Sequence, residues 1–319
     1  MKRIKSARPL ATNEPIWNKR AAFNHREAIA FYLCISPWLI GFFVFVAGPM
    51  LASFLLSFVS WDYFTPIKWV GTRNYERIRE DEAFWTALRV TFTFAALYVP
   101  LSQIISLAVA LMLAQKIKGV SFFRTIFYLP AILSGTAYVV LWVWLFEPDK
   151  GLINNLLDRL GIKGPRWLSD PNTALYALVI MSLWGLGSSL ITYIAGLKGI
   201  PEQLYEAAEL DGAGKFGRFR YITIPMLSPT IFFNLVLALI QTFQSYTTAA
   251  VATGGGPLDS TLFYLVYLYR RAFVNQEAGY AAALAWILFI IILLFTLLVV
   301  RSSSAWVYYE NETGKERRK

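Results

Sequence analysis

Six long apolar runs divide this chain, and none of them contains an aspartate, glutamate, lysine or arginine. Each run is long enough to cross a hydrocarbon core, which takes about 20 helical residues. The runs are continuous rather than alternating, so they predict helices and exclude the strands of a membrane barrel. We therefore predict an all-α, polytopic membrane protein, a bundle of six transmembrane helices at Phe31–Phe58, Val90–Ala114, Thr125–Phe146, Ala174–Leu197, Pro225–Ala250 and Ala278–Val300.

The polar segments around these runs complete the predicted organisation. Residues 1–29 are basic and polar and predict a cytoplasmic tail, and residues 302–319 predict a second one. Residues 30–301 form one six-helix domain, because no linker or clear repeat interrupts them. A cleaved signal peptide is not expected, since the first apolar run exceeds the apolar core of such a signal.

Several residues predict local features of the membrane helices. Prolines such as Pro37, Pro100 and Pro130 should bend helices or mark their ends. Tryptophans including Trp142 and Trp184 lie mostly toward the ends of the runs, as in an aromatic belt. The patch 262–269 is apolar but too short to span, so we expect an interfacial or re-entrant helix there.

Composition and charge agree with this assignment. Hydrophobic residues make up 56% of the 319 positions, more than a soluble domain could cover with polar surface. With the N-terminus inside, the cytoplasmic segments hold 19 of the 30 lysines and arginines, which predicts cytoplasmic N- and C-termini. The cations flank the apolar runs, so topology explains the net charge of +10 and no nucleic-acid partner is expected. The single Cys34 and the single His25 predict no disulfide, metal site or catalytic triad.

The polar segment Pro201–Pro225 lies between two membrane-length runs and predicts a helix–turn–helix elbow. Pro201 suits the first turn of a helix, and Gly212 and Gly214 are suited to end it. From Lys215 a second short amphipathic stretch leads to Pro225, which we expect to begin the next membrane helix. We refer to residues Pro201–Pro225 as the elbow.

The elbow contains a G-x-G-x-x-G sequence at residues 212–217, but its surroundings argue against a nucleotide site. A dinucleotide site needs a preceding strand, whereas a helix precedes here and a membrane run follows. A phosphate-binding loop would need Lys and then Ser or Thr where Arg218 and Phe219 stand. No cofactor is therefore expected in this chain, and the energy for any transport must come from a partner or from an ion gradient.

The membrane runs help to choose between those two sources. Proton-coupled carriers usually keep a carboxylate or histidine within the membrane, and these runs have none. An ion-gradient-driven secondary carrier for a neutral polar solute stays the alternative. A membrane enzyme would need clustered acids, and only Glu80-Asp81-Glu82 resembles such a cluster; a solvated loop explains it more simply.

Uncharged polar side chains gather in the fourth and fifth runs. Gln241, Gln244 and Ser245 share one face at i, i+3 and i+4 of a helix, and an amide that faces lipid is costly. Such a face suits a neutral polyol such as a sugar. Small and hydroxyl residues such as Gly187, Ser189 and Thr192 are equally consistent with helix packing.

Two motifs of the elbow carry a family resemblance. Glu206-Ala207-Ala208 with Gly212, and then Ile224-Pro225, resembles the EAA loop of ABC importer membrane subunits, with Ile224 where that family usually has Leu. The stretches 37–41, 253–257 and 279–283 extend the resemblance to the maltose-type sugar permeases.

The resemblance implies functional positions. In the family this loop docks into a cleft of the ATPase subunit, which implies that the coupling residues are Glu206, Ala207, Ala208, Asp211, Gly212 and Pro225. Sugar-contacting positions of the maltose permease fall on Gly185, Ser188, Gln241, Thr242, Ser245 and Thr247. The side chains there differ from those of that permease, so the same sugar is not implied.

The resemblance also implies a bacterial inner-membrane complex. Its other members would be a second homologous permease, two ATPase subunits that bind ATP and Mg, and an extracytoplasmic solute-binding protein. This chain would then be a transport subunit in membrane lipid, not itself an enzyme, and its cargo a sugar or oligosaccharide.

Overall fold

A computed structural model of the protein describes residues 25–115 and 118–308, and the chain divides into two compact units, residues 1–53 and 54–319. The predicted tails, residues 1–29 and 302–319, fall largely outside the described residues. The first unit is helical, with α1 (His25–Phe42), η2 (Phe43–Ala47) and the first part of α2 (Gly48–Leu56). These elements form one helical stretch, Ala28–Leu56, that is long and apolar enough to cross a membrane.

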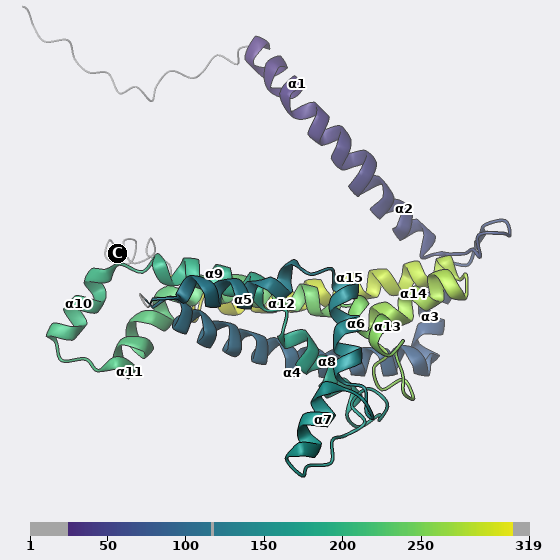
Figure 1. The fold of residues 1–319 in the computed structure, drawn as a ribbon. Coiled ribbons are helices and arrows are strands. Elements are labelled where there is room, and N and C mark those ends of the chain that lie inside the picture. The colour runs from purple at the N-terminus through teal and green to yellow at the C-terminus, as the bar shows by residue number, and fades with distance from the viewer. Residues whose placement is uncertain (1–24, 116–117, 309–319) are drawn as a thin grey trace, which may run out of the picture. The chain divides into compact units, whose positions relative to one another are not determined.

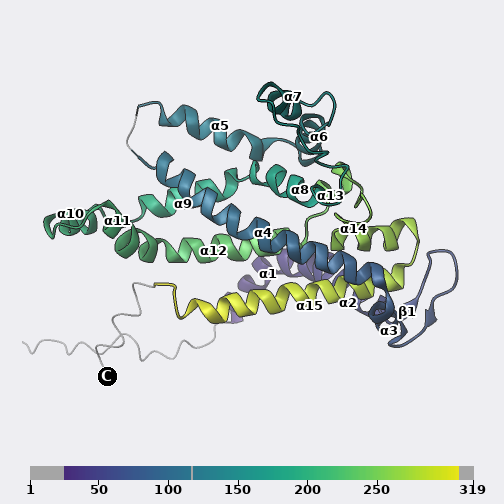
Figure 2. The same ribbon diagram turned by 90° about the horizontal axis from the view of Figure 1, so that it is seen from below.

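The second unit is built of helices and one very short strand pair (Figures 1 and 2). The two strands are antiparallel, with Val59 opposite Trp69, and they are a small departure from the all-α prediction. The elements are, in chain order, β1 (Val59–Ser60), β2 (Lys68–Trp69), α3 (Arg73–Glu80), α4 (Glu82–Leu113), α5 (Val120–Ile132), α6 (Gly135–Leu145), α7 (Leu152–Arg159), α8 (Ala174–Leu183), α9 (Gly187–Lys198), α10 (Glu202–Leu210), α11 (Lys215–Arg218), η3 (Phe219–Thr223), α12 (Ile224–Phe243), α13 (Thr247–Ala252), α14 (Tyr264–Tyr269), η4 (Arg270–Val274) and α15 (Ala278–Ser303).

The described residues contain four unbroken candidate membrane spans, or up to six if two bent helix pairs each count as one. The unbroken ones are Ala28–Leu56, Glu82–Leu113, Lys215–Phe243 and Ala278–Ser303. The bent pairs occupy the third and fourth predicted runs. All six predicted runs are therefore mainly helical, but three of them are not single straight helices. The third and fourth runs contain the bent pairs, and the fifth is interrupted between the end of α12 at Phe243 and the start of α13 at Thr247.

The third run is broken by a turn of 102° between α5 and α6. Leu133 and Ser134 adopt extended backbone conformations there and end the helical hydrogen-bond pattern. Pro130 lies just before the break, where its missing N–H and its ring weaken the last turn of α5. Pro37 and Pro100 instead lie inside α1 and α4, which continue past them.

The fourth run bends by 46° between α8 and α9, at Trp184, Gly185 and Leu186. The Trp184 ring lies at this bend and stacks on Tyr138 of α6, with ring centroids 5.6 Å apart. It also meets the Trp142 ring edge-on at 5.9 Å. Trp142 and Trp184 therefore contact each other between helices, and the aromatic belt stays a prediction.

Helix α4 runs through the middle of the second unit and packs against α8, α9, α12 and α14. Its buried side chains join a core that includes Phe94, Phe243 and Leu284. Close helix approach depends on glycine at two positions. A Cβ on Gly187 would lie 2.8 Å from Ala131 Cβ of α5, and one on Gly196 would lie 2.5 Å from Thr230 Oγ1 of α12. The packing interpretation of Gly187 is thus confirmed.

The short apolar patch 262–269 is largely buried within the second unit. Leu262, Phe263 and Tyr264 are at most 1% exposed, and α14 packs between α4 and α15. The Tyr264 N–H donates to Thr91 Oγ1 at 2.8 Å, and its hydroxyl donates to the Leu284 carbonyl at 2.8 Å. The patch therefore forms a short helix that supplies core, and its expected position as an interfacial or re-entrant helix stays a prediction.

The elbow helices α10 and α11 project from one end of the second unit, and α3 and α14 lie at the opposite end (Figures 1 and 2). Helices α4 and α15 extend along the unit, and α9 and α12 lie in the half next to the elbow (Figure 2). Two candidate functional regions are described below, a polar cavity and the elbow. Helices α9 and α12 line the cavity, and the elbow connects these two helices.

Candidate functional site

A polar cavity lies between α4, α8, α9 and α12, next to the two helix breaks. It has two compartments of about 230 and 110 Å³, and Tyr98, Gly185 and Gln241 line both. The bend at Gly185 and the break at Ser134 open this space, since straight helices would pack side chains into it. Within the described part of the chain, every residue that lines the two compartments is uncharged.

The structure brings together five of the six residues predicted to contact substrate. Thr242 and Ser245 line the larger compartment, Ser188 lines the smaller one, and Gly185 and Gln241 line both. The Thr242 hydroxyl donates to the Ala238 carbonyl at 2.6 Å. Toward the cavity, Thr242 can therefore contribute its methyl group and a hydroxyl oxygen that accepts a hydrogen bond. Thr247 is not among the lining residues and instead approaches Gly135 at the start of α6.

The predicted helical face of Gln241, Gln244 and Ser245 is only partly correct. Helix α12 ends at Phe243, and Gln244 is its C-cap residue with φ −95° and ψ 11°. Ser245 therefore lies beyond the regular helix, and the chain turns before α13. Gln241 and Ser245 still line the larger compartment, whereas Gln244 is exposed and lines neither.

Two tyrosines of the cavity were missed by the sequence analysis. Tyr98 of α4 stacks on Phe94 with ring centroids 5.4 Å apart, and Tyr138 of α6 donates its hydroxyl to the Met181 carbonyl. The signal available in the sequence was a tyrosine inside an apolar run, because a buried tyrosine hydroxyl usually finds a polar partner. Flat aromatic surface next to amides suits the C–H faces and hydroxyls of a sugar.

Next to the smaller compartment, the side chains of Tyr193 and Gln103 and the backbone carbonyl of Asn234 connect α9, α4 and α12. The Tyr193 hydroxyl donates to Gln103 Oε1 at 2.5 Å, and Gln103 Nε2 lies 3.5 Å from the Asn234 carbonyl. Asn234 is 3% exposed and lines the compartment, and its Nδ2 has no hydrogen-bond partner among the described residues. This nitrogen is itself buried, so it is an unsatisfied donor within the helix packing at the wall of the compartment.

The elbow folds as predicted in its first half. Helix α10 ends in a glycine turn in which Gly212 has φ +78°. The Ala213 N–H donates to Ala208 O at 2.8 Å, and the Gly212 N–H donates to Glu209 O at 3.0 Å. These are the two hydrogen bonds of a Schellman motif. Gly212 is thus confirmed as the end of the helix, and no side chain could adopt this φ without strain.

The second half of the elbow differs from the prediction. Helices α11, η3 and α12 form one continuous span, Lys215–Phe243, so Pro225 does not begin the membrane helix. It lies at the first positions of α12, after the π-helical turn η3 in which the Ile224 N–H donates to Phe219 O. The wider turn spaces the backbone so that the missing N–H of Pro225 falls where the hydrogen-bond pattern changes.

Two contacts hold the elbow together from inside. Arg218 Nη1 lies 3.2 Å from Glu209 Oε2, and the Tyr205 hydroxyl lies 3.0 Å from Thr223 Oγ1. These contacts join α10 to the segment α11–η3. Because Glu209 is exposed, solvent screens most of the attraction between its carboxylate and Arg218. The elbow is therefore a connected element rather than an open loop.

The predicted coupling residues lie on the elbow's surface. Glu206, Ala207, Asp211 and Gly212 are exposed, whereas Ala208 and Pro225 are half-buried. Large apolar side chains are exposed beside them: Leu210 is 90% exposed, Phe216 79% and Tyr221 77%. An exposed apolar set on a polar element marks an interaction surface.

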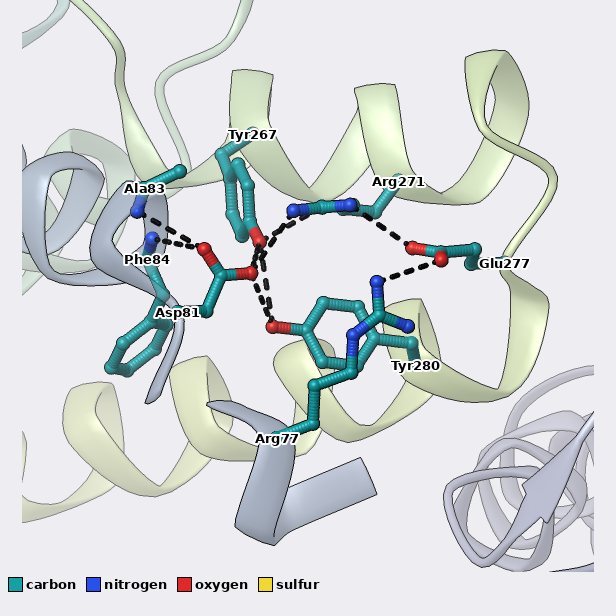
Figure 3. Close-up of polar contacts among 8 residues, drawn as sticks. All are labelled: Arg77, Asp81, Ala83, Phe84, Tyr267, Arg271, Glu277 and Tyr280. Atoms are coloured by element: carbon teal, nitrogen blue, oxygen red, sulfur yellow. Dashed lines mark hydrogen bonds and ion pairs between the residues drawn. The ribbon is translucent and has the colours of Figure 1, made fainter. Parts of the chain in front are cut away.

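At the opposite end of the unit, the structure reveals a network around Asp81 (Figure 3). Asp81 caps α4 through Oδ1, which accepts from the Ala83 N–H at 3.0 Å. Its Oδ2 accepts from the Tyr267 and Tyr280 hydroxyls and from Arg271 Nη2, the last at 3.0 Å. The expectation that Glu80-Asp81-Glu82 is a solvated loop is therefore wrong for Asp81, whose side chain is 11% exposed.

Two further ion pairs extend this network. Arg271 Nη1 lies 3.2 Å from Glu277 Oε2, and Arg77 Nη2 lies 2.8 Å from Glu277 Oε1. The Arg77 guanidinium also lies over the Tyr280 ring, 4.3 Å from its centroid. Together these contacts join α3, the start of α4, η4 and the start of α15.

Opposing effects act on the pKa of Asp81. Burial raises this pKa, whereas hydrogen bonds from Tyr267 and Tyr280 and the positive charge of Arg271 lower it. The net result is a pKa below the usual value for aspartate. The carboxylate is thus charged at neutral pH and acts as an acceptor. In the described part of the chain no group of three or more histidine, cysteine or acidic residues could hold a metal ion.

The chain is similar in sequence to known membrane components of transport systems. Residues 105–306 match the family model described as binding-protein-dependent transport system inner membrane component. A probable ABC transporter permease protein, YesP of Bacillus subtilis, is 43% identical over 92% of this chain and 96% of its own length. The trehalose/maltose transport system permease protein MalF of Thermococcus litoralis is 33% identical over 89% of this chain and 97% of its own length.

A solved structure shares the fold. It is a bacterial alginate ABC transporter in complex with an alginate pentasaccharide-bound periplasmic protein. Its matching chain is 22% identical, with a TM-score of 0.77, over 87% of this chain and 95% of that one. The likeness thus covers most of both chains rather than a single motif.

Proposed function

Because this chain belongs to the family of binding-protein-dependent transport system inner membrane components, we propose that it is a permease subunit of an ABC importer for a sugar or oligosaccharide. The observation that carries the proposal is the uncharged cavity between the membrane-length helices. Amide, hydroxyl and aromatic side chains line it, and these groups match a sugar's hydroxyls and C–H faces. The trehalose/maltose permease and the alginate transporter, named above, handle cargo of the same class.

The proposed substrate path runs through this cavity. Gly185, Ser188, Gln241, Thr242 and Ser245 line it, and we add Tyr98, Tyr138 and Asn234 to this set. Thr247 stays in the proposal at the edge of the cavity, next to Gly135. Gln241 is the central residue, because its amide can donate and accept and because it borders both compartments.

The proposed orientation places the elbow and both termini in the cytoplasm, with six membrane spans in the bacterial inner membrane. The excess of lysine and arginine on that side supports this orientation. The opposite ends of the second unit, one with the elbow and one with the Asp81 network, agree with it (Figure 1). The Asp81 network would then lie on the extracytoplasmic face.

The proposed driving force is ATP hydrolysis by partner subunits. The elbow residues Glu206, Ala207, Ala208, Asp211, Gly212 and Pro225 would couple the ATPase to the membrane helices. Two ATPase subunits would bind ATP and Mg, a second permease would complete the pathway, and an extracytoplasmic binding protein would deliver the sugar. The exposed Leu210 and Phe216 support a protein partner for the elbow.

The proposed mechanism is alternating access. ATP would close the ATPase dimer, and the elbow would transmit this closure to the membrane helices that flank it. Since α12 is continuous with α11, movement of the elbow would reach Gln241 along one helix. A ligand or nucleotide can shift this equilibrium only through different contacts in the two conformations, and the elbow provides such a contact.

Uptake of labelled oligosaccharides into proteoliposomes tests the proposal. The vesicles would contain this chain with its co-purifying permease and ATPase subunits, and the binding protein would be added outside. We expect uptake that needs ATP inside and survives a protonophore. Uptake by this chain alone that a protonophore abolishes would instead establish the ion-gradient-driven carrier.

A further inference from the structure

A second cavity lies outside the proposed substrate path, on the elbow side of the second unit. It is a groove of about 460 Å³ between α5 and α9, close to the end of α4. Apolar side chains dominate its walls, among them Phe127, Leu129, Ile132, Ile191 and Ile194. We call it the cationic groove, because two basic residues, Arg124 and Lys198, line it and, among the residues that the structure describes, no acidic one does.

The fold fixes Arg124 in position. Its Nε and Nη2 donate to the Leu113 carbonyl, at 3.1 and 2.5 Å, and so satisfy a carbonyl of the last turn of α4. Its Nη1 has no hydrogen-bond partner among residues 25–115 and 118–308. The guanidinium is therefore anchored on one side and keeps a donor for an anion.

Lys198 supplies the second charge. It is the last residue of α9, it is exposed, and no described carboxylate pairs with it. The elbow helix α10 begins four residues later, at Glu202. The two cations thus mark the end of the groove that is nearest to the elbow, and the apolar side chains extend away from it along α5 and α9.

We propose that the cationic groove binds an anionic phospholipid, with its phosphate near Arg124 and Lys198 and an acyl chain along α5 and α9. A soluble anion would leave the apolar walls uncovered, and a neutral lipid would leave two cations without a counter-charge. Basic pockets between membrane helices at the cytoplasmic side are suited to anionic headgroups. The assignment to the inner leaflet rests on the proposed orientation; the binding itself does not.

The position of the groove gives the lipid a consequence for coupling. Lys198 immediately precedes the turn into α10, so a headgroup bound to it restrains the segment between α9 and α10, where the elbow begins. Gly187 also lines the groove, and its missing side chain lets α5 and α9 approach closely there. An anionic lipid here stabilises the arrangement of α5, α9 and the elbow.

Native mass spectrometry of the delipidated full-length chain tests the proposal. The chain is titrated with phosphatidylglycerol or phosphatidylcholine that carry identical acyl chains. We expect wild type to bind phosphatidylglycerol more tightly, and Lys198→Gln to weaken that binding roughly fivefold with phosphatidylcholine unchanged. Lys198→Arg should keep the preference, and Arg220→Gln, which removes an exposed elbow cation outside the groove, should not alter it.

Three results would overturn the proposal. One is equal affinity of wild type for the two lipids, and another is an unchanged preference in Lys198→Gln. The third is efficient cross-linking of a cysteine at Ile191 to the second permease in the assembled complex, which would show that a protein helix fills the groove. The mass-spectrometric arm needs neither sugar nor ATP, so its outcome is independent of the proposed transport function. Arg124→Gln is a less informative variant, because loss of the guanidinium also removes the hydrogen bonds to the Leu113 carbonyl and can disturb the end of α4.

Discussion

The Asp81 carboxylate lies 3.0 Å from the Arg271 guanidinium, although 190 residues separate them in the chain. This pair joins the start of α4 to the segment after α14, and both tyrosine hydroxyls beside it donate to the same carboxylate (Figure 3). The pair therefore fastens segments that local sequence could not bring together.

Asp81→Asn should destabilise the protein. The substitution removes one of the two negative partners of the partly buried Arg271, since Glu277 stays, and it removes the charged acceptor of the Tyr267 and Tyr280 hydroxyls. We expect this loss to cost about 2 kcal/mol in the free energy of unfolding. Thermal unfolding in detergent measures this effect. Glu80→Gln is the matched control, because Glu80 is exposed and adjacent. Equal melting temperatures for both variants would contradict the structural role of Asp81.

The stabilising effect of Asp81 should depend on pH. Its pKa is lower in the folded protein than in the unfolded chain, so its contribution is fully present above the unfolded value of about 3.9. That contribution is lost as pH falls through the folded pKa. The difference in melting temperature between wild type and Asp81→Asn should therefore be constant from pH 7 to pH 5 and narrow at pH 3. A difference of the same size at pH 3 would argue against a charged pair.

Gly212→Val should uncouple transport while leaving membrane insertion intact. Gly212 has φ +78°, and a β-branched side chain there costs about 1–2 kcal/mol of backbone strain and opens the turn after α10. If this strain disfavours the turn that contacts the ATPase, ATP-dependent uptake should fall roughly tenfold, because about 1.4 kcal/mol corresponds to a factor of ten in an equilibrium constant. Gly214→Val is the control, because Gly214 has φ −69° and open space around its Cα. Normal uptake by Gly212→Val would remove the elbow from the coupling mechanism.

Glu206→Lys should weaken attachment of the ATPase without unfolding the elbow. Glu206 is exposed, and the contacts that hold the elbow together involve Glu209 and Arg218 instead. We expect less ATPase subunit to co-purify and sugar-stimulated ATP hydrolysis to fall by about tenfold, the loss expected when a charge-assisted contact of 1.5 kcal/mol is removed. Asp158→Lys, an equal charge reversal on the exposed side of α7, should leave both measurements unchanged. Unaltered co-purification would place the contact elsewhere.

Gln241→Ala should reduce sugar uptake. Loss of one amide that borders both compartments removes about 1 kcal/mol of hydrogen bonding, or roughly a fivefold change in apparent affinity. The structure supplies a matched control, Gln244→Ala, because Gln244 is exposed and lines neither compartment. Gly187→Ala is unsuitable, since its new Cβ would lie 2.8 Å from Ala131 Cβ. Equal uptake by the two glutamine variants would contradict the proposed substrate path.

The sequence predicted much of the architecture, because membrane insertion depends on local composition. An uncharged run of about 20 residues is a helix in lipid whatever surrounds it, since its backbone groups can bond only within the run. The end of α10 was equally local: Gly212 is suited to positive φ, and the Schellman bonds follow within five residues. The family resemblance of the elbow likewise depended on residues close together in the chain.

Only the tertiary structure decided where those helices break and what their breaks enclose. The 102° turn after α5, the bend at Gly185, and the meeting of Tyr98 with Gln241 depend on packing between segments that are far apart in sequence. The same holds for Asp81. Its acidic neighbours Glu80 and Glu82 predict a solvated side chain, but α14 and α15 cover it in the folded protein, so that it is largely buried. Local hydrophobicity determines which segments enter the membrane, but the partners of a polar side chain are set by the helices that pack around it.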